Sequence, residues 1–204
     1  MASISNEAYH VKLYGLILCG GLSTRMGKDK DELKYHGIPQ SRYMFELASN
    51  CCEQTFYSVR EDQKSSYNGL PKIIDRDEYQ GPLNGILSAH EEFPKVAWLV
   101  LACDLPLLNL PNIQNLVLQR DNSKNATVFS KREDNLPEPL VAIWEPKGLR
   151  NLKNNIAEKR AFGPRQFLRS TEIAFVYPSD ENVLFNANSM EQFEQAQLHL
   201  KSKD

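Results

Sequence analysis

The stretch LYGLILCGGLSTRMGKDK, residues 13–30, joins an apolar run to a loop that is rich in glycine and positive charge. The apolar run, Leu13 to Leu18, predicts a buried strand. Gly20 and Gly21 follow it, and glycine allows backbone N–H groups to approach an anion closely. Three cations complete the loop: Arg25, Lys28 and Lys30. Because phosphates bind beyond the carboxyl ends of parallel strands in open α/β sheets, the stretch predicts an α/β fold with a phosphate-binding loop.

The rest of the chain alternates apolar, strand-like runs with segments of helical periodicity. Such alternation predicts a three-layer α/β/α, Rossmann-like fold with a mostly parallel central sheet, whose first four strands take the order 3-2-1-4. Further strands are expected at residues 55–59, 72–74, 96–102, 126–130, 140–144 and 173–177. Helices are expected at residues 41–52, 83–93, 147–157, 164–168 and 189–200, and one more begins at Pro111.

The length of 204 residues suits one domain. We expect the polar residues 1–10 to form a flexible tail and residues 11–204 to form the domain. The formal net charge of −2 provides no general basic field for nucleic acid. No apolar segment is long enough to span a membrane, and the first apolar run lacks the basic leader of a signal peptide. We therefore expect neither a nucleic-acid partner nor a membrane.

Cysteine spacing excludes a zinc site, because Cys19, Cys51, Cys52 and Cys103 form no CxxC pair. Free thiols in a reducing cytosol are the simplest interpretation, so we expect a cytoplasmic location. Cys19 and Cys103 end two strands that the 3-2-1-4 order makes neighbours. Neighbouring strands lie about 4.8 Å apart, near the Cα separation of a disulfide. Two hypotheses follow: the pair is simple packing, or its oxidation ties the glycine loop to the neighbouring strand.

The glycine loop fits neither of two familiar phosphate motifs. Five residues separate Gly21 from Gly27, and Asp29 follows Lys28, which excludes a P-loop; the pair Gly20-Gly21 breaks the dinucleotide fingerprint. An ordinary turn with solvated charges is the alternative interpretation. The loop resembles instead the signature LAGGxSxRMGxDK of the molybdenum cofactor guanylyltransferase family of nucleotidyltransferases. All of its specified positions match except one, where Cys19 stands in place of the usual Ala.

A second matching region is Asp75 followed by the turn GPLNGI at residues 81–86. The family shows an Asp and then a GPLAG-like turn that opens a helix. Gly81 and Gly85 allow close backbone approach, and Pro82 stiffens the turn. Asn84 departs from the usual Ala, and it would either touch the ligand or face water.

A third region is Asp104, which follows the most apolar run of the chain, Val96 to Ala102. A carboxylate at the carboxyl end of a central strand is a common position for a metal ligand, and the alternative is a helix-capping Asp. The resemblance implies that Asp104 holds magnesium.

Two late motifs complete the resemblance, which extends from Leu13 to about Phe193. The run PEPLVAIW at residues 137–144 is similar to the family's strand on the acceptor side, and implies that Pro139 and Leu140 bind the acceptor. The run FNANS at residues 185–189 is similar to the family's N-x-N-[ST] motif, and implies the same for Asn186 and Asn188. From the residues alone, Ser189 would cap the last helix, and both interpretations can hold together.

The resemblance implies Mg²⁺-dependent transfer of GMP from GTP to molybdenum-loaded molybdopterin. Other molybdenum cofactor biosynthesis proteins, or the target molybdoenzymes, are then candidate partners. Residues of about 11–108 would bind the NTP, and residues of about 109–204 the acceptor. The implied catalytic residues are Arg25, Lys30 and Asp104. The implied nucleotide-binding residues are Leu18, Cys19, Gly20, Gly21, Lys30, Asp75, Gly81, Pro82, Gly85 and Asp104.

Two alternative functions stay open. The first keeps the fold and changes the substrates, to CTP or to a sugar-1-phosphate acceptor. The pair Gly20-Gly21, rather than Ala-Gly, favours the guanylyl branch. The second is a nucleotide-binding module without catalysis, against which the combined presence of Lys30, Asp104 and Asn188 argues.

Overall fold

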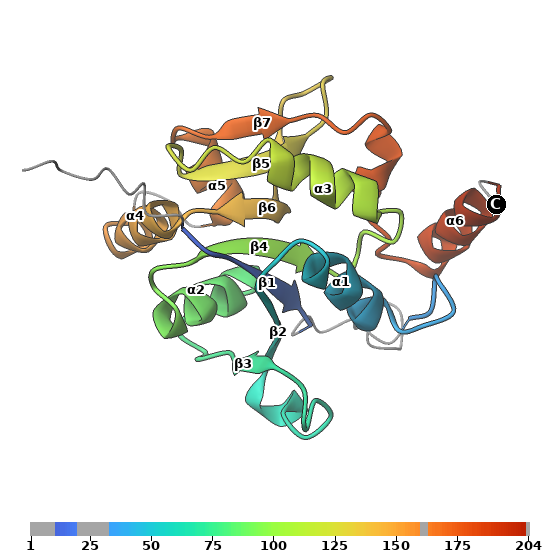
Figure 1. The fold of residues 1–204 in the computed structure, drawn as a ribbon, viewed down its shortest axis with the longest axis horizontal. Helices are drawn as coiled ribbons and strands as arrows, with labels where there is room; N and C mark the ends of the chain where they lie inside the picture. Colours follow the sequence, from blue (N-terminus) through green and yellow to red (C-terminus); the bar gives the residue numbers. More distant parts are fainter. Residues whose placement is uncertain (1–10, 20–32, 160–162, 203–204) are drawn as a thin grey trace, which may run out of the picture.

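A computed structural model gives the fold and describes residues 11–19, 33–159 and 163–202 (Figure 1). The expected tail, residues 1–10, lies outside this range. The strands are β1 (Leu13–Leu18), β2 (Gln54–Val59), β3 (Lys72–Ile74), β4 (Ala97–Ala102), β5 (Ala126–Ser130), β6 (Pro137–Trp144) and β7 (Ala174–Val176). The helices are α1 (Gln40–Ser49), α2 (Pro82–Glu92), α3 (Leu110–Leu118), α4 (Pro146–Ala157), α5 (Pro164–Arg169) and α6 (Met190–Lys201), with short 3-10 turns η2 (Glu61–Gln63) and η3 (Glu181–Leu184).

The strands form one sheet of order β3-β2-β1-β4-β6-β5-β7. Its neighbours pair in parallel except where β6 pairs with β4 and with β5. The prediction of a mostly parallel sheet, with the order 3-2-1-4 in its first half, is therefore confirmed. Strand β6 runs antiparallel because residues 131–136 are too few for the crossover that a parallel connection needs.

Strand β6 begins three residues before the expected start at Leu140. Prolines at 137 and 139 argue against strand in a sequence, because proline donates no ladder hydrogen bond. The ladder between β4 and β6 ends at Val141, so the first residues of β6 pair with β5 alone. Proline is tolerated there because the ladder is one-sided.

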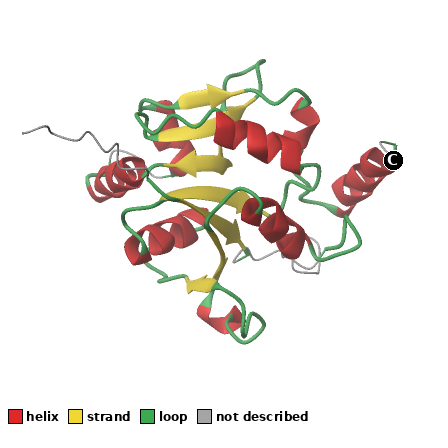
Figure 2. Cartoon of the chain, in the orientation of Figure 1, coloured by secondary structure: helices red, strands yellow, loops and turns green. Residues whose placement is uncertain are grey.

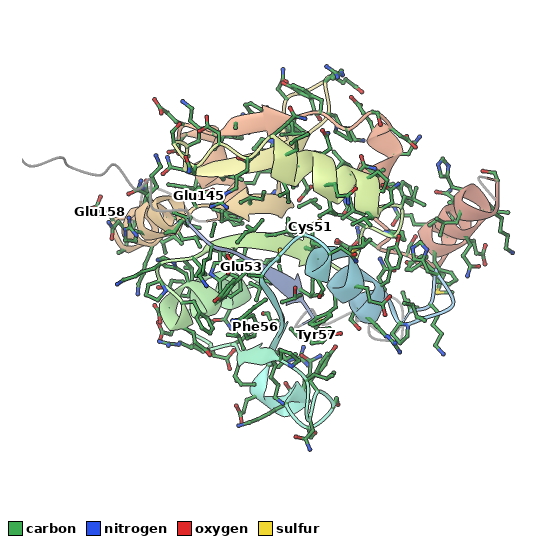
Figure 3. The ribbon with its side chains drawn as sticks, in the orientation of Figure 1. Cys51, Glu53, Phe56, Tyr57, Glu145 and Glu158 are labelled. Atoms are coloured by element: carbon green, nitrogen blue, oxygen red, sulfur yellow. The ribbon has the colours of Figure 1, made fainter. Side chains whose placement is uncertain are left out.

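Helices cover both faces of the sheet, which confirms the three-layer architecture (Figure 2). One face packs against α1 and α3, and the other packs against α2, α4 and α5. The side chains of neighbouring residues in a strand point to opposite faces of the sheet. Tyr57 packs in the layer of α1 and α3, and Phe56 packs in the layer of α2, α4 and α5 (Figure 3). Every residue of β4, at the centre, is buried. Helix α6 packs apart from these layers, against Leu33, Tyr35 and Leu107.

The pairing directions decide where a site can form. Strands β1, β2, β3 and β4 are parallel, so their carboxyl ends share one edge of the sheet. Strand β6 is antiparallel to them, so its first residues lie at that same edge. We call this the carboxyl edge. Within the described ranges, no helix is long and apolar enough to cross a membrane.

Candidate functional site

The carboxyl edge brings together residues that are far apart in the sequence. In the order of the strands they are Asp75 after β3, Ser58 in β2, Leu18 in β1, Asp104 after β4 and Glu138 in β6. Asp104 thus separates the β1–β3 side of the edge from the β6 side. The resemblance assigned nucleotide binding to the first side and acceptor binding to the second, and the strand order keeps Leu18 and Asp75 apart from Pro139 and Leu140.

Two hydrogen bonds fix Asp75 at the end of β3. Its backbone N–H donates to the carbonyl of Val59 at 2.9 Å, and its carboxylate oxygen Oδ1 accepts from the hydroxyl of Ser58 at 2.7 Å. Burial raises the pKa of the Asp75 carboxyl, and the bond from Ser58 opposes that rise. Sequence reasoning missed Ser58, because a serine inside an apolar strand matches no motif. Only the fold shows that it faces Asp75.

The turn that leads into α2 is rigidly built. Gly81 has φ of 61°, a backbone conformation that favours glycine, and Pro82 begins the helix. Asn84 is buried; its side-chain oxygen accepts from the backbone N–H of Tyr79 at 3.4 Å, and its amide donates to Asp77 at 3.2 Å. Asn84 therefore holds the turn together and does not face water.

Gly85 lies in the first turns of α2, where the helix meets β1 and β2. A Cβ atom at this position would lie 2.1 Å from Ser58 Oγ and 3.0 Å from Leu18 Cδ2. Side-chain carbons do not approach other atoms so closely, so only glycine permits the observed packing. At Gly85 the helix thus packs closely on β1 and β2, whereas its role in nucleotide binding stays a prediction.

We expect Gly85→Ala to destabilise the fold by about 1–3 kcal/mol, the usual cost of an overpacked core. The new methyl group must displace the Ser58 hydroxyl and break its bond to Asp75. Losing one hydrogen bond of this kind corresponds to a decrease in nucleotide affinity of about 2–10-fold, if Asp75 contacts the nucleotide. Urea unfolding and nucleotide titration measure the two effects.

Gly163→Ala is the matched control for Gly85→Ala. Gly163 has an extended backbone, and no atom of the residues that the structure describes lies within 4 Å of its Cβ position. We expect this variant to unfold at the wild-type urea concentration. Equal stability of the Gly85 and Gly163 variants would contradict the packing argument.

Asp104 follows β4 by two residues and is tied to the segment that precedes α6. Its backbone carbonyl accepts a hydrogen bond from the N–H of Ala187 at 2.8 Å. Burial is the largest cause of raised pKa values at Tyr35 (to about 12) and at Glu138, and the charge of Asp104 adds to both. The helix-capping alternative is wrong for the helix that follows, because Asn109 caps α3.

The donor set around Asp104 bears on the expected metal. Among the residues that the structure describes, no three His, Cys, Asp or Glu side chains gather to hold a metal ion. This set does not suit a resident metal with only protein ligands. It fits Mg²⁺, which proteins hold through one or two carboxylates while substrate phosphates and water complete the shell. Asp104 lies at the carboxyl edge after the central strand, where the sequence predicted this role, and its binding of Mg²⁺ stays a prediction.

On the acceptor side, Pro139 and Leu140 lie near the start of β6. Pro139 is buried, and its carbonyl accepts from the indole N–H of Trp144 at 3.1 Å. Leu140 is half-buried. Their contact with an acceptor stays a prediction.

The asparagine motif leads into α6. Ser189 caps this helix by accepting from the N–H of Gln192 at 3.2 Å, as the sequence predicted. Asn186 is half-buried and Asn188 is exposed. Because Ala187, the residue between them, is bonded to Asp104, both asparagines lie on the segment that adjoins the expected metal ligand. Their binding roles stay predictions.

Gly20, Gly21, Arg25 and Lys30 lie outside the described residues. Their expected roles in nucleotide binding and catalysis therefore stay predictions. The strand that leads to them ends at Leu18, and the N–H of Cys19 donates to the carbonyl of Ser58 at 3.0 Å. The described part of β1 and Cys19 therefore ends at the carboxyl edge, beside Ser58.

Cys19 and Cys103 are neighbours on one face of the sheet. The register pairs Leu18 with Ala102, so the two cysteines stand one step beyond that pair. Both belong to the layer of Tyr57, with 3% and 6% exposure. All four cysteines are described, and each is a thiol. The geometry agrees with both cysteine hypotheses, and the packing role is the one that the structure contains.

Three comparisons with known proteins identify the family and the fold. The family described as the MobA-like NTP transferase domain matches residues 15–174. A "Molybdenum cofactor biosynthesis bifunctional protein" from Synechocystis sp. is 35% identical over 90% of this chain, and a "Probable molybdenum cofactor guanylyltransferase" from Nostoc sp. is 27% identical over 88%. The chain spans 53% of the first relative's length and 87% of the second's.

The third comparison concerns the fold alone. The crystal structure of molybdopterin-guanine dinucleotide biosynthesis protein A from Archaeoglobus fulgidus superimposes with a TM-score of 0.74 at 21% identity. The match covers 94% of this chain and 100% of that one. A shared fold at this identity supports the architecture and leaves the substrates to be argued from the site.

Proposed function

This chain belongs to the MobA-like NTP transferase family and is a nucleotidyltransferase, and on that premise we propose that it transfers GMP from GTP to molybdenum-loaded molybdopterin. The acceptor's terminal phosphate oxygen attacks the α-phosphorus of GTP. A new P–O bond forms, the bond to the β-phosphate oxygen breaks, and pyrophosphate leaves. The other product is the molybdopterin guanine dinucleotide cofactor. The proposal includes a cytoplasmic location, where Cys19, Cys51, Cys52 and Cys103 would stay reduced.

The observation that carries the proposal is the position of Asp104 at the carboxyl edge. It lies between the Ser58–Asp75 pair on the side of β1–β3 and Glu138 on the side of β6. The hydrogen bond from Ala187 also holds the asparagine motif against it. A transfer between two phosphates needs charge neutralisation at the place where two substrates meet, and a position between the two groups of residues would let Asp104 provide it.

In the proposed reaction, different residues would bind the metal, the nucleotide and the leaving pyrophosphate. Asp104 would hold Mg²⁺, which when bound neutralises charge on the reacting phosphates. The backbone from Leu18 to Gly21 would cradle the nucleotide, and Asp75 would contact its base or ribose. Arg25 and Lys30 would stabilise the charge that develops on pyrophosphate. No side-chain nucleophile is required, because the acceptor supplies its own phosphate oxygen.

A nucleotide panel followed by a transfer assay tests the proposal. GTP with Mg²⁺ should raise the melting temperature more than ATP, CTP or UTP do, and labelled GTP with molybdenum-loaded molybdopterin should yield the dinucleotide and pyrophosphate. A clear preference for CTP or UTP would favour the alternative transferases. Absence of any response to all four nucleotides would favour a module without catalysis.

A further inference from the structure

Glu138 is a charged residue held inside the acceptor side of the carboxyl edge. Its side chain is only 14% exposed. One carboxylate oxygen, Oε1, accepts from the backbone N–H of Leu140 at 3.3 Å, and the other, Oε2, accepts from Nη2 of Arg165 at 2.8 Å. A carboxylate with both oxygens engaged cannot rotate freely. The start of β6 therefore carries a fixed negative charge that faces α5.

Arg165 is the side chain that this carboxylate fixes. It comes from α5, which packs on the same face of the sheet as α2 and α4. Its side chain is 54% exposed, although one of its guanidinium nitrogens is bound to a largely buried carboxylate. Within the described residues, Nε and Nη1 of Arg165 have no hydrogen-bond acceptor. Nη2 thus holds the guanidinium of Arg165 in place, and the other donors of this group face solvent.

The pair lies close to Asp104. Burial raises the pKa of the Glu138 carboxyl, and the negative charge of Asp104 adds to that rise. The register gives the same result, because Leu101 of β4 pairs with Val141 of β6 in the antiparallel sense and the residues that follow β4 therefore adjoin the first residues of β6. Residues 98 and 100 of β4 and residues 140, 142 and 144 of β6 face the layer of α2, α4 and α5, and Glu138 reaches the same layer through its bond with Arg165.

We propose that Arg165 is a phosphate-positioning residue for the acceptor, and that Glu138 holds its guanidinium in place. This assignment rests on the proposed function, in which the acceptor carries a phosphate monoester to the side of Asp104 that faces β6. A guanidinium matches two phosphate oxygens with two parallel N–H donors, and the second N–H of Nη2 completes such a pair with Nη1 or with Nε. Fixing the fork in advance with a buried carboxylate lowers the entropy lost when the phosphate binds.

Glu138 itself could in principle accept N–H groups from a heterocycle of the acceptor. Both of its oxygens already accept hydrogen bonds, whereas Arg165 has donors to spare. The geometry therefore favours recognition of an anion by Arg165 over recognition of a heterocycle by Glu138.

Steady-state kinetics of the transfer reaction, with GTP and acceptor varied separately, test the assignment. Arg165→Ala should raise the KM for the acceptor about 10–100-fold, the value of one charge-assisted hydrogen bond, and leave the KM for GTP within about twofold. Arg165→Lys should restore part of the affinity, because lysine keeps the charge and loses the fork. Glu138→Gln should raise the acceptor KM in the same direction, and the double variant should be no worse than Arg165→Ala.

Arg169→Ala is the matched control, since Arg169 is exposed at the other end of α5 and the change removes the same charge. Its kinetics should equal those of the wild type. An unchanged acceptor KM in Arg165→Ala, alone or with a lower melting temperature, would overturn the assignment while leaving the proposed function in place. So would a larger effect of Glu138→Gln than of Arg165→Ala. If the wild-type protein fails to transfer GMP, the proposed function is wrong and the assignment falls with it.

Discussion

Asp104→Asn should abolish transfer while leaving the fold intact. The change removes one charge and preserves shape, and a metal that neutralises reacting phosphates is worth several kcal/mol, about a thousandfold in rate. The hydrogen bond from Ala187 to Asp104 uses the backbone carbonyl, so the variant keeps it. The measurements are kcat with GTP and acceptor at saturating Mg²⁺, and the melting temperature.

Asp134→Asn provides the comparison for Asp104→Asn. Asp134 is exposed in the connection from β5 to β6, and its carboxylate oxygen Oδ1 accepts from the N–H of Leu136 at 2.9 Å, a bond that an asparagine oxygen can keep. It loses the same charge away from the expected metal, so its turnover should match the wild type. Wild-type turnover in Asp104→Asn would remove Asp104 from the mechanism. A large fall in its melting temperature would instead point to a structural role.

The position of Asp104 could be predicted from the sequence because local pattern and topology agree there. The apolar run before it forms β4, whose residues are all buried, and a central parallel strand ends at the ligand-binding edge of such a sheet. Gly81, Pro82 and Gly85 were predictable for a similar reason, because a turn imposes its own residue preferences. These features depend on short stretches of chain.

The residues that the sequence did not reveal depend on contacts between distant segments. Ser58 and Asp75 meet because β2 and β3 pair in parallel, and no local motif marks that serine. Glu138 and Arg165 meet only because β6 reverses direction, which places its first residues at the carboxyl edge. Pro137 and Pro139 argue against a strand at these residues, so the sequence did not indicate that β6 begins there. Residues marked by a local strand or turn motif could therefore be predicted, whereas contacts between residues of different strands and helices could not.

A second large effect is expected at the opposite edge of the sheet, where Arg120 and Glu145 form a buried ion pair. Nε and Nη2 of Arg120 donate to the two carboxylate oxygens of Glu145, at 2.7 and 3.0 Å, and Nη1 donates to the carbonyl of Val11 at 3.1 Å. The side chain of Glu145 is 2% exposed and that of Arg120 is 13% exposed. Glu145 directly follows β6, and Figure 3 labels it beside α4.

We expect Arg120→Met to destabilise the protein by about 3–5 kcal/mol, because it leaves the Glu145 carboxylate buried without its partner. For a chain of this length, that corresponds to a decrease of about 6–20 °C in melting temperature. Replacing both residues, as Arg120→Met with Glu145→Leu, should recover most of the loss, since a buried ion pair gains little over well-packed apolar side chains. Urea unfolding of the single and double variants measures the difference.

The control for this pair is Lys124→Met, which breaks the exposed ion pair with Glu172 and should cost at most about 1 kcal/mol. Equal costs for Lys124→Met and Arg120→Met would show that the buried pair contributes no more than a surface one. Glu145 follows Trp144, which pairs with the start of β4, so the ion pair lies a full strand length from Asp104. Below its melting temperature, Arg120→Met should therefore keep the wild-type kcat. A fall in kcat at a temperature where the variant is folded would mean that the two edges of the sheet are coupled, and that β4 and β6 transmit strain from the ion pair to the site.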